Sequence, residues 1–243
     1  MQPELKPVRT NDPGFGRGVP YDAAQDIAVG AERQKVLRNT YLLLALTMVP
    51  TVIGAFVGMA TSSIVVANPI ISSLVMLAAV IGLQFGIAAR RNSGLGVALL
   101  LLMTGILGWW LGPILNVALS MNNGMALVGY AAVGTGAIFL TMGAIATTTK
   151  RDFSFMGKFL FVGMIALLIA MIANMWLQIP ALALTLSTLV IVVFSLFLLY
   201  DLNRIVRGGE TNYVMATTGV YLSLINIFAS LLHLLMALTG ERD

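Results

Sequence analysis

Residues 192–219 read VVFSLFLLYDLNRIVRGGETNYVMATTG, and they contain the end of one long apolar run and the start of another. The first run ends at Asp201, and the second begins near Tyr213 after a short charged segment. A helix that crosses about 30 Å of hydrocarbon needs about 20 apolar residues, because it must satisfy its own backbone hydrogen bonds there. The stretch therefore predicts two membrane-spanning helices joined by a polar loop.

The composition of the whole chain agrees with this prediction. Hydrophobic residues make up 58% of the 243 and charged residues only 10%, and the mean hydropathy is +0.93, which excludes an ordinary soluble domain. The absence of cysteine excludes disulfides, thiolate metal sites and a cysteine nucleophile. His233 is the single histidine, which excludes a zinc site built from several histidines. We predict no cofactor and no metal.

Seven stretches are long and apolar enough to span a membrane, and together they predict an all-α integral membrane protein, a seven-transmembrane-helix bundle. They cover residues 40–60, 69–89, 95–119, 124–147, 158–178, 180–200 and 213–239. Proline at the first position of a helix is favourable, so Pro69 and Pro180 mark two of the helix starts. Pro113 should kink the third span, and Gly129, Gly136 and the other glycines of the fourth span should let a neighbouring helix approach closely.

The positions of lysine and arginine predict the orientation, because short cytoplasmic loops retain these residues. Thirteen of the 14 cations fall on one face if the seven spans are correct, and only Arg242 falls on the other. We expect the N-terminus in the cytoplasm and the C-terminus outside. The excess of basic residues is then explained by the orientation of the protein in the membrane, and no nucleic-acid partner is predicted.

The N-terminal residues 1–38 are rich in proline, glycine and mixed charge, a composition typical of a flexible segment. We predict a flexible cytoplasmic tail over residues 1–38 and a transmembrane domain over residues 39–243. The tail does not resemble a signal peptide, so we expect it to stay on the mature chain. It is either a solvated leader without a role or a handle for a cytoplasmic partner.

The last span carries polar and small residues on one side. At about 100° per residue they fall within a stripe about 80° wide, which comprises Gly219, Ser223, Asn226, Ser230 and His233. Polar groups facing lipid are costly, so this stripe should face neighbouring helices near the centre of the bundle. It serves either interhelical hydrogen bonding or a hydrated path.

Asp201 at the end of the sixth span also has two interpretations. A carboxylate at this depth can reach water near the headgroups and pair with Arg204 one turn on. The free-energy cost of a charge at this end of the helix is therefore small. Alternatively it is functional and has a partner on the same membrane face, for which Arg90 and Arg204 are the candidates.

The sequence gives little support to an enzymatic activity, because the motifs of known enzyme classes are incomplete or missing. Tyr200-Asp201 resembles half of an intramembrane aspartyl protease, but that chemistry needs two carboxylates that share a proton, and the last span contains no second aspartate. The sequence also lacks a zinc-protease motif, a serine-hydrolase motif and a phosphate-binding loop. We predict that the protein is not an enzyme.

Several motifs resemble the Bax inhibitor-1 (transmembrane BAX-inhibitor-motif) family. They are KVLRNTY (35–41), LGPILN (111–116), TKRDFSFMGKFL (149–160), YDLNRIVRGGETNY (200–213) and VYLSLINIFASLL (220–232). The chain resembles most the bacterial YccA branch, from about residue 35 to the end. The resemblance implies a seven-helix bundle whose last helix is central.

The resemblance also implies a function. The YccA branch is known as a modulator of FtsH, a membrane-anchored ATP-dependent protease that forms a complex with the HflK and HflC proteins. Other branches are described as calcium leaks with a pH latch made of two aspartates and an arginine. Asp201 matches the first aspartate and Arg90 the arginine, but Ser223 stands in place of the second aspartate.

An aspartate facing a serine has one titratable member and no like-charge repulsion to open a gate. The leading hypothesis is therefore a non-enzymatic protein of the bacterial inner membrane that binds and restrains FtsH, in which Asp201 locks the sixth and seventh helices together through Ser223 or Arg90. The alternative is a pH-sensitive leak for calcium or protons. A small-solute transporter is the third interpretation, and no inverted repeat supports it.

Overall fold

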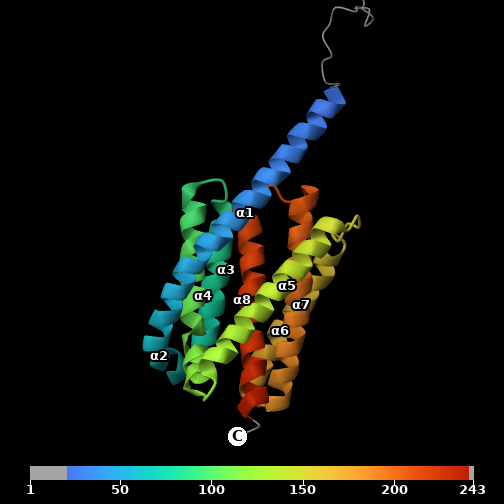
Figure 1. Cartoon of the computed structure of the whole chain (residues 1–243). Coiled ribbons are helices and arrows are strands. Elements are labelled where there is room, and N and C mark those ends of the chain that lie inside the picture. Colours follow the sequence, from blue (N-terminus) through green and yellow to red (C-terminus); the bar gives the residue numbers. More distant parts are fainter. Residues whose placement is uncertain (1–20, 241–243) are drawn as a thin grey trace, which may run out of the picture.

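The computed structural model describes residues 21–240, and every regular element in this range is an α-helix. The elements are α1 (Tyr21–Ala60), α2 (Ser62–Ala67), α3 (Pro69–Ala89), α4 (Gly94–Ser120), α5 (Gly124–Thr148), α6 (Met156–Leu177), α7 (Pro180–Arg207) and α8 (Tyr213–Gly240). Seven of them are long and apolar enough to cross a membrane, which confirms the predicted fold. The short α2 lies between α1 and α3 (Figure 1).

Helix α1 differs from the other spans in its length of 40 residues. At 1.5 Å per residue such a helix is about 60 Å long, twice the thickness of the hydrocarbon layer. Figure 1 shows its N-terminal part projecting beyond the ends of the other helices. The helix therefore continues across the predicted boundary between residues 38 and 39, and residues 1–20 of the tail predicted over residues 1–38 lie outside the described residues.

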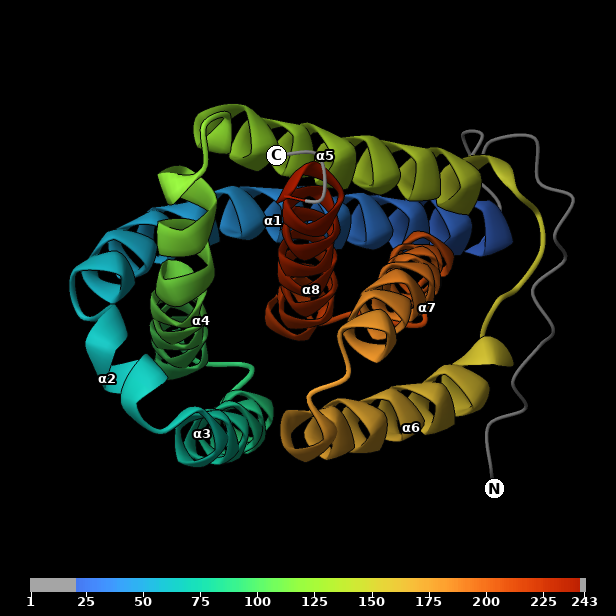
Figure 2. The same ribbon diagram turned by 90° about the horizontal axis from the view of Figure 1, so that it is seen from below.

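Helix α8 lies at the centre of the bundle. It contacts α1, α3, α4, α5 and α7, and the view along the helices shows it surrounded by them (Figure 2). Its side chains Val220, Tyr221, Ile227 and Leu232 are fully buried. The expectation of a central last helix is confirmed.

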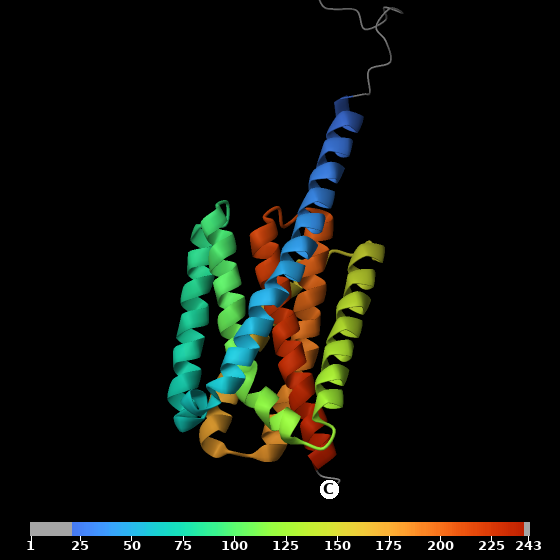
Figure 3. The ribbon, with the colours of Figure 1, turned by 60° about the vertical axis from the view of Figure 1, so that its left-hand side comes forward.

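Helices α1 and α4 cross at very close range because glycines meet there (Figure 3). A Cβ atom added to Gly54 or Gly58 of α1 would overlap the α4 backbone, and one added to Gly108 or Gly112 of α4 would overlap the α1 backbone. Gly129 and Gly136 of α5, which we expected to allow close approach, have open space beside them. The small residues therefore act at α1 and α4, where the backbones can touch without side chains between them.

A buried tyrosine joins three helices in the middle of the bundle. The Tyr221 hydroxyl of α8 lies 2.7 Å from Thr51 Oγ1 of α1 and 3.2 Å from the Thr104 carbonyl oxygen of α4. A buried phenol needs such partners, so these contacts fix the depth of α8 relative to the α1–α4 pair.

The basic loops meet at one end of the bundle. Asn212 Nδ2 in the α7–α8 loop donates to the Arg91 carbonyl oxygen in the α3–α4 loop at 3.1 Å. Buried Asn203 of α7 holds the α5–α6 loop, where its Oδ1 accepts from the Phe153 N–H at 3.2 Å. Within the described residues, the segments 61–68, 121–123 and 178–179 at the opposite end carry no charge.

Candidate functional site

Two polar contacts define the packing of α7 against α8. At the basic end, the Asp201 carboxylate lies against Gly219, and toward the other end Ser187 Oγ lies 3.0 Å from His233 Nδ1. The two contacts are 14 residues apart along each helix, which is about 21 Å and four turns at the 3.5-residue repeat of helices that wrap around each other. The polar stripe of α8 therefore faces α7.

Asp201 is at the wall of a cavity of about 170 Å³ at the basic end. The cavity is bounded by α3, α7, α8 and the α7–α8 loop, and its polar lining includes Gln84, Glu210 and Thr218. Within the described part of the chain, no hydrogen bond or ion pair is formed by the Asp201 side chain. Arg204 lines the same cavity, so the carboxylate shares it with a cation to which it makes no direct ion pair.

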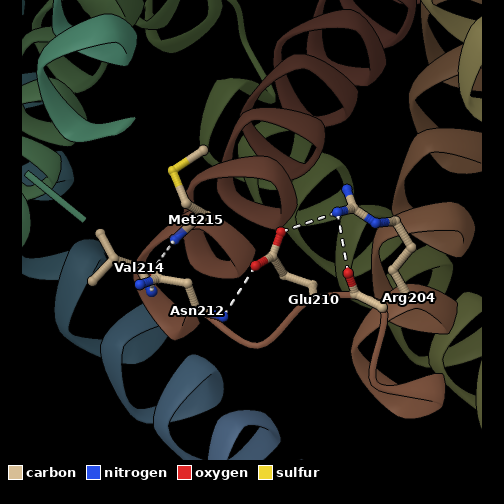
Figure 4. A network of polar contacts seen from close by, with 6 residues as sticks. Arg204, Glu210, Asn212, Val214 and Met215 are labelled. Carbon is tan, nitrogen blue, oxygen red and sulfur yellow. Dashed lines mark hydrogen bonds and ion pairs between the residues drawn. The ribbon is translucent and has the colours of Figure 1, made fainter. Parts of the chain in front are cut away.

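Arg204 pairs with a different carboxylate from the one we expected. Its Nη2 lies 3.1 Å from Glu210 Oε2 and 3.4 Å from the Gly209 carbonyl oxygen (Figure 4). The α7 helix ends at Arg207, and the φ of +78° at the following Gly208 reverses the chain and brings Glu210 back over the last turn. Asp201 faces α8, and the ion pair that the structure shows for Arg204 is with Glu210, while a pairing of Asp201 with Arg204 stays a prediction.

Asn212 connects this ion pair to the start of α8. Its backbone N–H donates to Glu210 Oε1 at 3.0 Å, and its Oδ1 accepts from the N–H groups of Val214 and Met215 at 3.0 and 3.1 Å (Figure 4). An asparagine in this position satisfies backbone donors that the first turn of a helix leaves free. We call Arg204, Glu210 and Asn212 the clasp.

Arg90 and Ser223 do not bond to Asp201 in the described part of the structure. Arg90 is exposed at the end of α3, and its backbone N–H contacts Gly86 and Ile87. Ser223 is buried one turn beyond Gly219 on α8. The proposed lock through Ser223 or Arg90 therefore stays a prediction, while the contact seen at Asp201 is with Gly219.

The remaining members of the polar stripe have different partners. Asn226 Nδ2 donates to the Leu222 carbonyl oxygen of its own helix at 2.8 Å. His233 bonds across to α7, and Ser230 lies beside His233 on the wall of a second cavity between α6, α7 and α8. Interhelical hydrogen bonding, one of the two interpretations of the stripe, is thus observed at His233.

Comparison with known proteins decides the family. The sequence profile of the Bax1-I family, described as "Inhibitor of apoptosis-promoting Bax1", matches residues 33–240. The chain belongs to the Bax1-I family. A relative from Escherichia coli K12 named "Modulator of FtsH protease YccA" is 41% identical over 201 residues, which cover 83% of this chain and 89% of the relative.

Two further relatives have similar coverage. A membrane protein of Vibrio cholerae is 42% identical over 204 residues, which cover 84% of this Bax1-I chain and 90% of the relative. A protein of Escherichia coli O6:H1 named "Inner membrane protein YccA" is 41% identical over 201 residues, with 83% and 89% covered. The resemblance inferred from the motifs is confirmed.

The α5–α6 loop of this Bax1-I chain has its own local order. The Ser154 hydroxyl and N–H both donate to Asp152 Oδ1, at 2.7 and 2.8 Å. These two hydrogen bonds hold the pKa of Asp152 below its ordinary value. Asp152 therefore stays ionised on the basic face and partly offsets the cations of this loop.

Sequence reasoning missed Glu210, Gln84 and Ser187 in this Bax1-I chain. Glu210 stands in the motif YDLNRIVRGGETNY, where the glycine pair before it signals a helix end and a returning loop. Ser187 is one of several hydroxyl residues in the sixth span, and no local pattern distinguishes it. Gln84 could have been noticed as the only amide in the second span.

Proposed function

We propose that this protein is a non-enzymatic, multi-pass protein of the bacterial inner membrane that binds a membrane-anchored ATP-dependent protease of the FtsH type and restrains it. The observation that carries the proposal is the 41% identity to the Escherichia coli modulator of FtsH protease over 83% of this chain and 89% of that relative. The family match over residues 33–240 reaches from the first of the seven spans to the last. A shared activity is the simplest reason for it.

The structure offers surfaces that suit lateral binding in the membrane. Large apolar side chains are exposed on the outer sides of the bundle, among them Phe159, Val162 and Ile169 on α6. Lipid covers such surfaces, and so can the helices of another membrane protein. The projecting part of α1 provides a second surface beyond the membrane, next to the basic loops.

We propose the orientation from the same loops. Short loops rich in lysine and arginine stay in the cytoplasm, which places the N-terminus inside and the C-terminus outside. The predicted tail over residues 1–38 then lies on the side where a protease of this class hydrolyses ATP. We propose that the protein acts within the complex that the protease forms with the HflK and HflC proteins.

Co-isolation and turnover test this proposal together. A tagged copy is purified in mild detergent from bacterial membranes, and FtsH is detected by immunoblotting. We expect recovery of the protease and, on overproduction, slower degradation of its membrane substrates. Absence of the protease from the eluate together with unchanged substrate lifetimes would contradict the proposal.

A pH-sensitive calcium or proton leak is the second candidate. It is favoured by one observation, the cavity at the basic end in which the Asp201 carboxylate has no bonded partner among residues 30–240. The serine at position 223 weakens it, because a single carboxylate lacks the repulsion that opens a paired latch. Vesicles loaded with a calcium dye test this candidate. If the calcium flux is the same in empty vesicles, in vesicles with the protein and in vesicles with the Asp201→Asn variant, the leak is removed as a candidate.

A further inference from the structure

A second cavity lies far from the basic end, between α6, α7 and α8. Its volume is about 270 Å³, and four polar residues take part in its lining. They are Asn174 of α6, Ser187 of α7, and Ser230 and His233 of α8. Met171 of α6 lines it as well and is 46% exposed, so the cavity reaches the outer surface of the bundle.

The hydrogen bonds in this cavity leave acceptors unused. Ser187 donates its hydroxyl proton to the Ala183 carbonyl oxygen at 3.0 Å. With that proton given to Ala183, the neutral His233 ring that fits the contact donates through Nδ1 to Ser187, at 3.0 Å, and in this tautomer Nε2 is an acceptor. No partner of His233 Nε2 or of the Ser230 hydroxyl is found between residues 30 and 240.

The depth of the cavity limits what can enter it. Ser187 and His233 each stand seven residues from the end of their helix on the uncharged side, which is about 10 Å inside a layer about 30 Å thick. A polar group without a partner is costly at that depth. The site should therefore be filled by a group that donates hydrogen bonds.

The size of the cavity limits the ligand further. One water molecule needs about 15 Å³ of such space, and pockets for drug-sized ligands begin at about 300 Å³. The observed 270 Å³ is thus much larger than a single water needs and below the size of a drug-sized pocket, which leaves room for a side chain. Lipid acyl chains fit the apolar part of the lining but offer no donor to Nε2.

We propose that this cavity receives a hydrogen-bond-donating side chain, such as serine, threonine, asparagine or glutamine, from a transmembrane helix of the protease partner. The proposal rests on the proposed function and specifies where the partner helix docks. The helix lies against α6 beside Met171, and its polar side chain reaches His233 Nε2 and Ser230. Such a contact selects helices with a donor at the matching depth, because a purely apolar helix leaves both groups unpaired.

Photo-crosslinking in membranes that contain an FtsH-type protease tests this docking site. A benzophenone amino acid replaces Met171 in one chain and Val133 in another. Val133 is 73% exposed on α5, which lies across the bundle from α6 (Figure 2). We expect the protease to crosslink at 171 at least about 5-fold more than at 133.

Polar variants then test the hydrogen bonds. His233→Asn keeps a donor for Ser187 but removes the Nε2 acceptor, and Ser230→Ala removes the hydroxyl. We expect each to lower crosslinking at 171 about 3-fold or more, in the range of single interhelical hydrogen bonds. Ser195→Ala is the matched control, because that hydroxyl bonds only to Ile191 of its own helix, and it should change nothing.

The outcomes separate this inference from the proposed function. Three results would overturn the docking site while the protease is still co-isolated: crosslinks at 133 alone, lipid as the only crosslinked product at 171, or variants that crosslink as strongly as wild type. The proposed function would then still stand. Failure to recover the protease at all overturns both.

Discussion

The Asp201 carboxylate of α7 lies directly against the backbone of Gly219 on α8. A Cβ atom at position 219 would be 2.6 Å from Asp201 Oδ2 and 3.1 Å from its Cγ. A larger residue here would require the carboxylate to move, at the interface between the central helix and its main neighbour. The contact explains how an aspartate is accommodated where two apolar helices pack.

Gly219→Ala should therefore destabilise the bundle by displacing Asp201. Overpacking of this kind costs about 1 to 3 kcal/mol, and Asp201→Ala in the same chain should recover much of the loss because it removes the group in the way. Thermal unfolding in detergent, measured for both single variants and the double variant, gives the coupling.

Gly163→Ala supplies the control, because a Cβ there meets nothing within 4 Å. Alanine favours a helix interior over glycine by up to about 1 kcal/mol, so this variant should be neutral or slightly stabilising. Equal stability of the Gly219 and Gly163 variants would show that Asp201 does not press on α8.

The α1–α4 crossing predicts a contrast between glycines. Gly58→Ala and Gly108→Ala place a methyl group into the backbone of the facing helix, so we expect lower expression and a large loss of thermal stability. Gly129→Ala and Gly136→Ala have open space and should behave like wild type. If all four variants purify with the same yield and melting temperature, the close crossing is incorrect.

The sequence contained enough information for the spans but not for this crossing. Hydrophobic length is a local property, so the helix starts at Pro69 and Pro180 could be placed to the residue, whereas α7 runs seven residues past its predicted end at 200. Glycines of a close contact need a partner helix, and sequence alone does not say which helices meet. The glycines of α5 therefore looked as suitable as Gly54 and Gly108.

In the candidate site, too, the features set by a single helix were predictable and those set by packing were not. The stripe on α8 was predictable because one helix fixes the relative directions of its own side chains. The partner of Arg204 was not, because the choice between Asp201 and Glu210 depends on the path of the loop after Gly208. Likewise, only the packing of α7 on α8 reveals that Ser187 meets His233.

The clasp predicts unequal effects of its members. Asn212→Ala removes an N-cap and the contacts to the α3–α4 loop, so it should cost about 1 to 2 kcal/mol and speed hydrogen exchange at Val214 and Met215. Glu210→Gln weakens a partly exposed ion pair, worth about 1 kcal/mol or less. If Glu210→Gln lowers the stability more than Asn212→Ala does, the inference that Asn212 contributes most to the clasp is contradicted.

The absence of cysteine makes the proposed orientation easy to test. A single cysteine is introduced at Ser154 in the α5–α6 loop or at Asn123 in the opposite loop, both of them exposed. In intact cells whose outer membrane is permeabilised, an impermeant maleimide should label position 123 and not 154. Inverted inner-membrane vesicles should give the reverse, and labelling of both positions from one side would contradict a membrane crossing by α5, which separates them.

Reconstitution from purified parts tests the central claim most directly. An FtsH-type protease and a membrane substrate are placed in liposomes with ATP, and substrate loss is followed with and without this protein at a matched lipid ratio. The account predicts slower degradation that deepens with added protein, while ATP hydrolysis by the protease continues. A degradation rate that is independent of the protein at every ratio would contradict it.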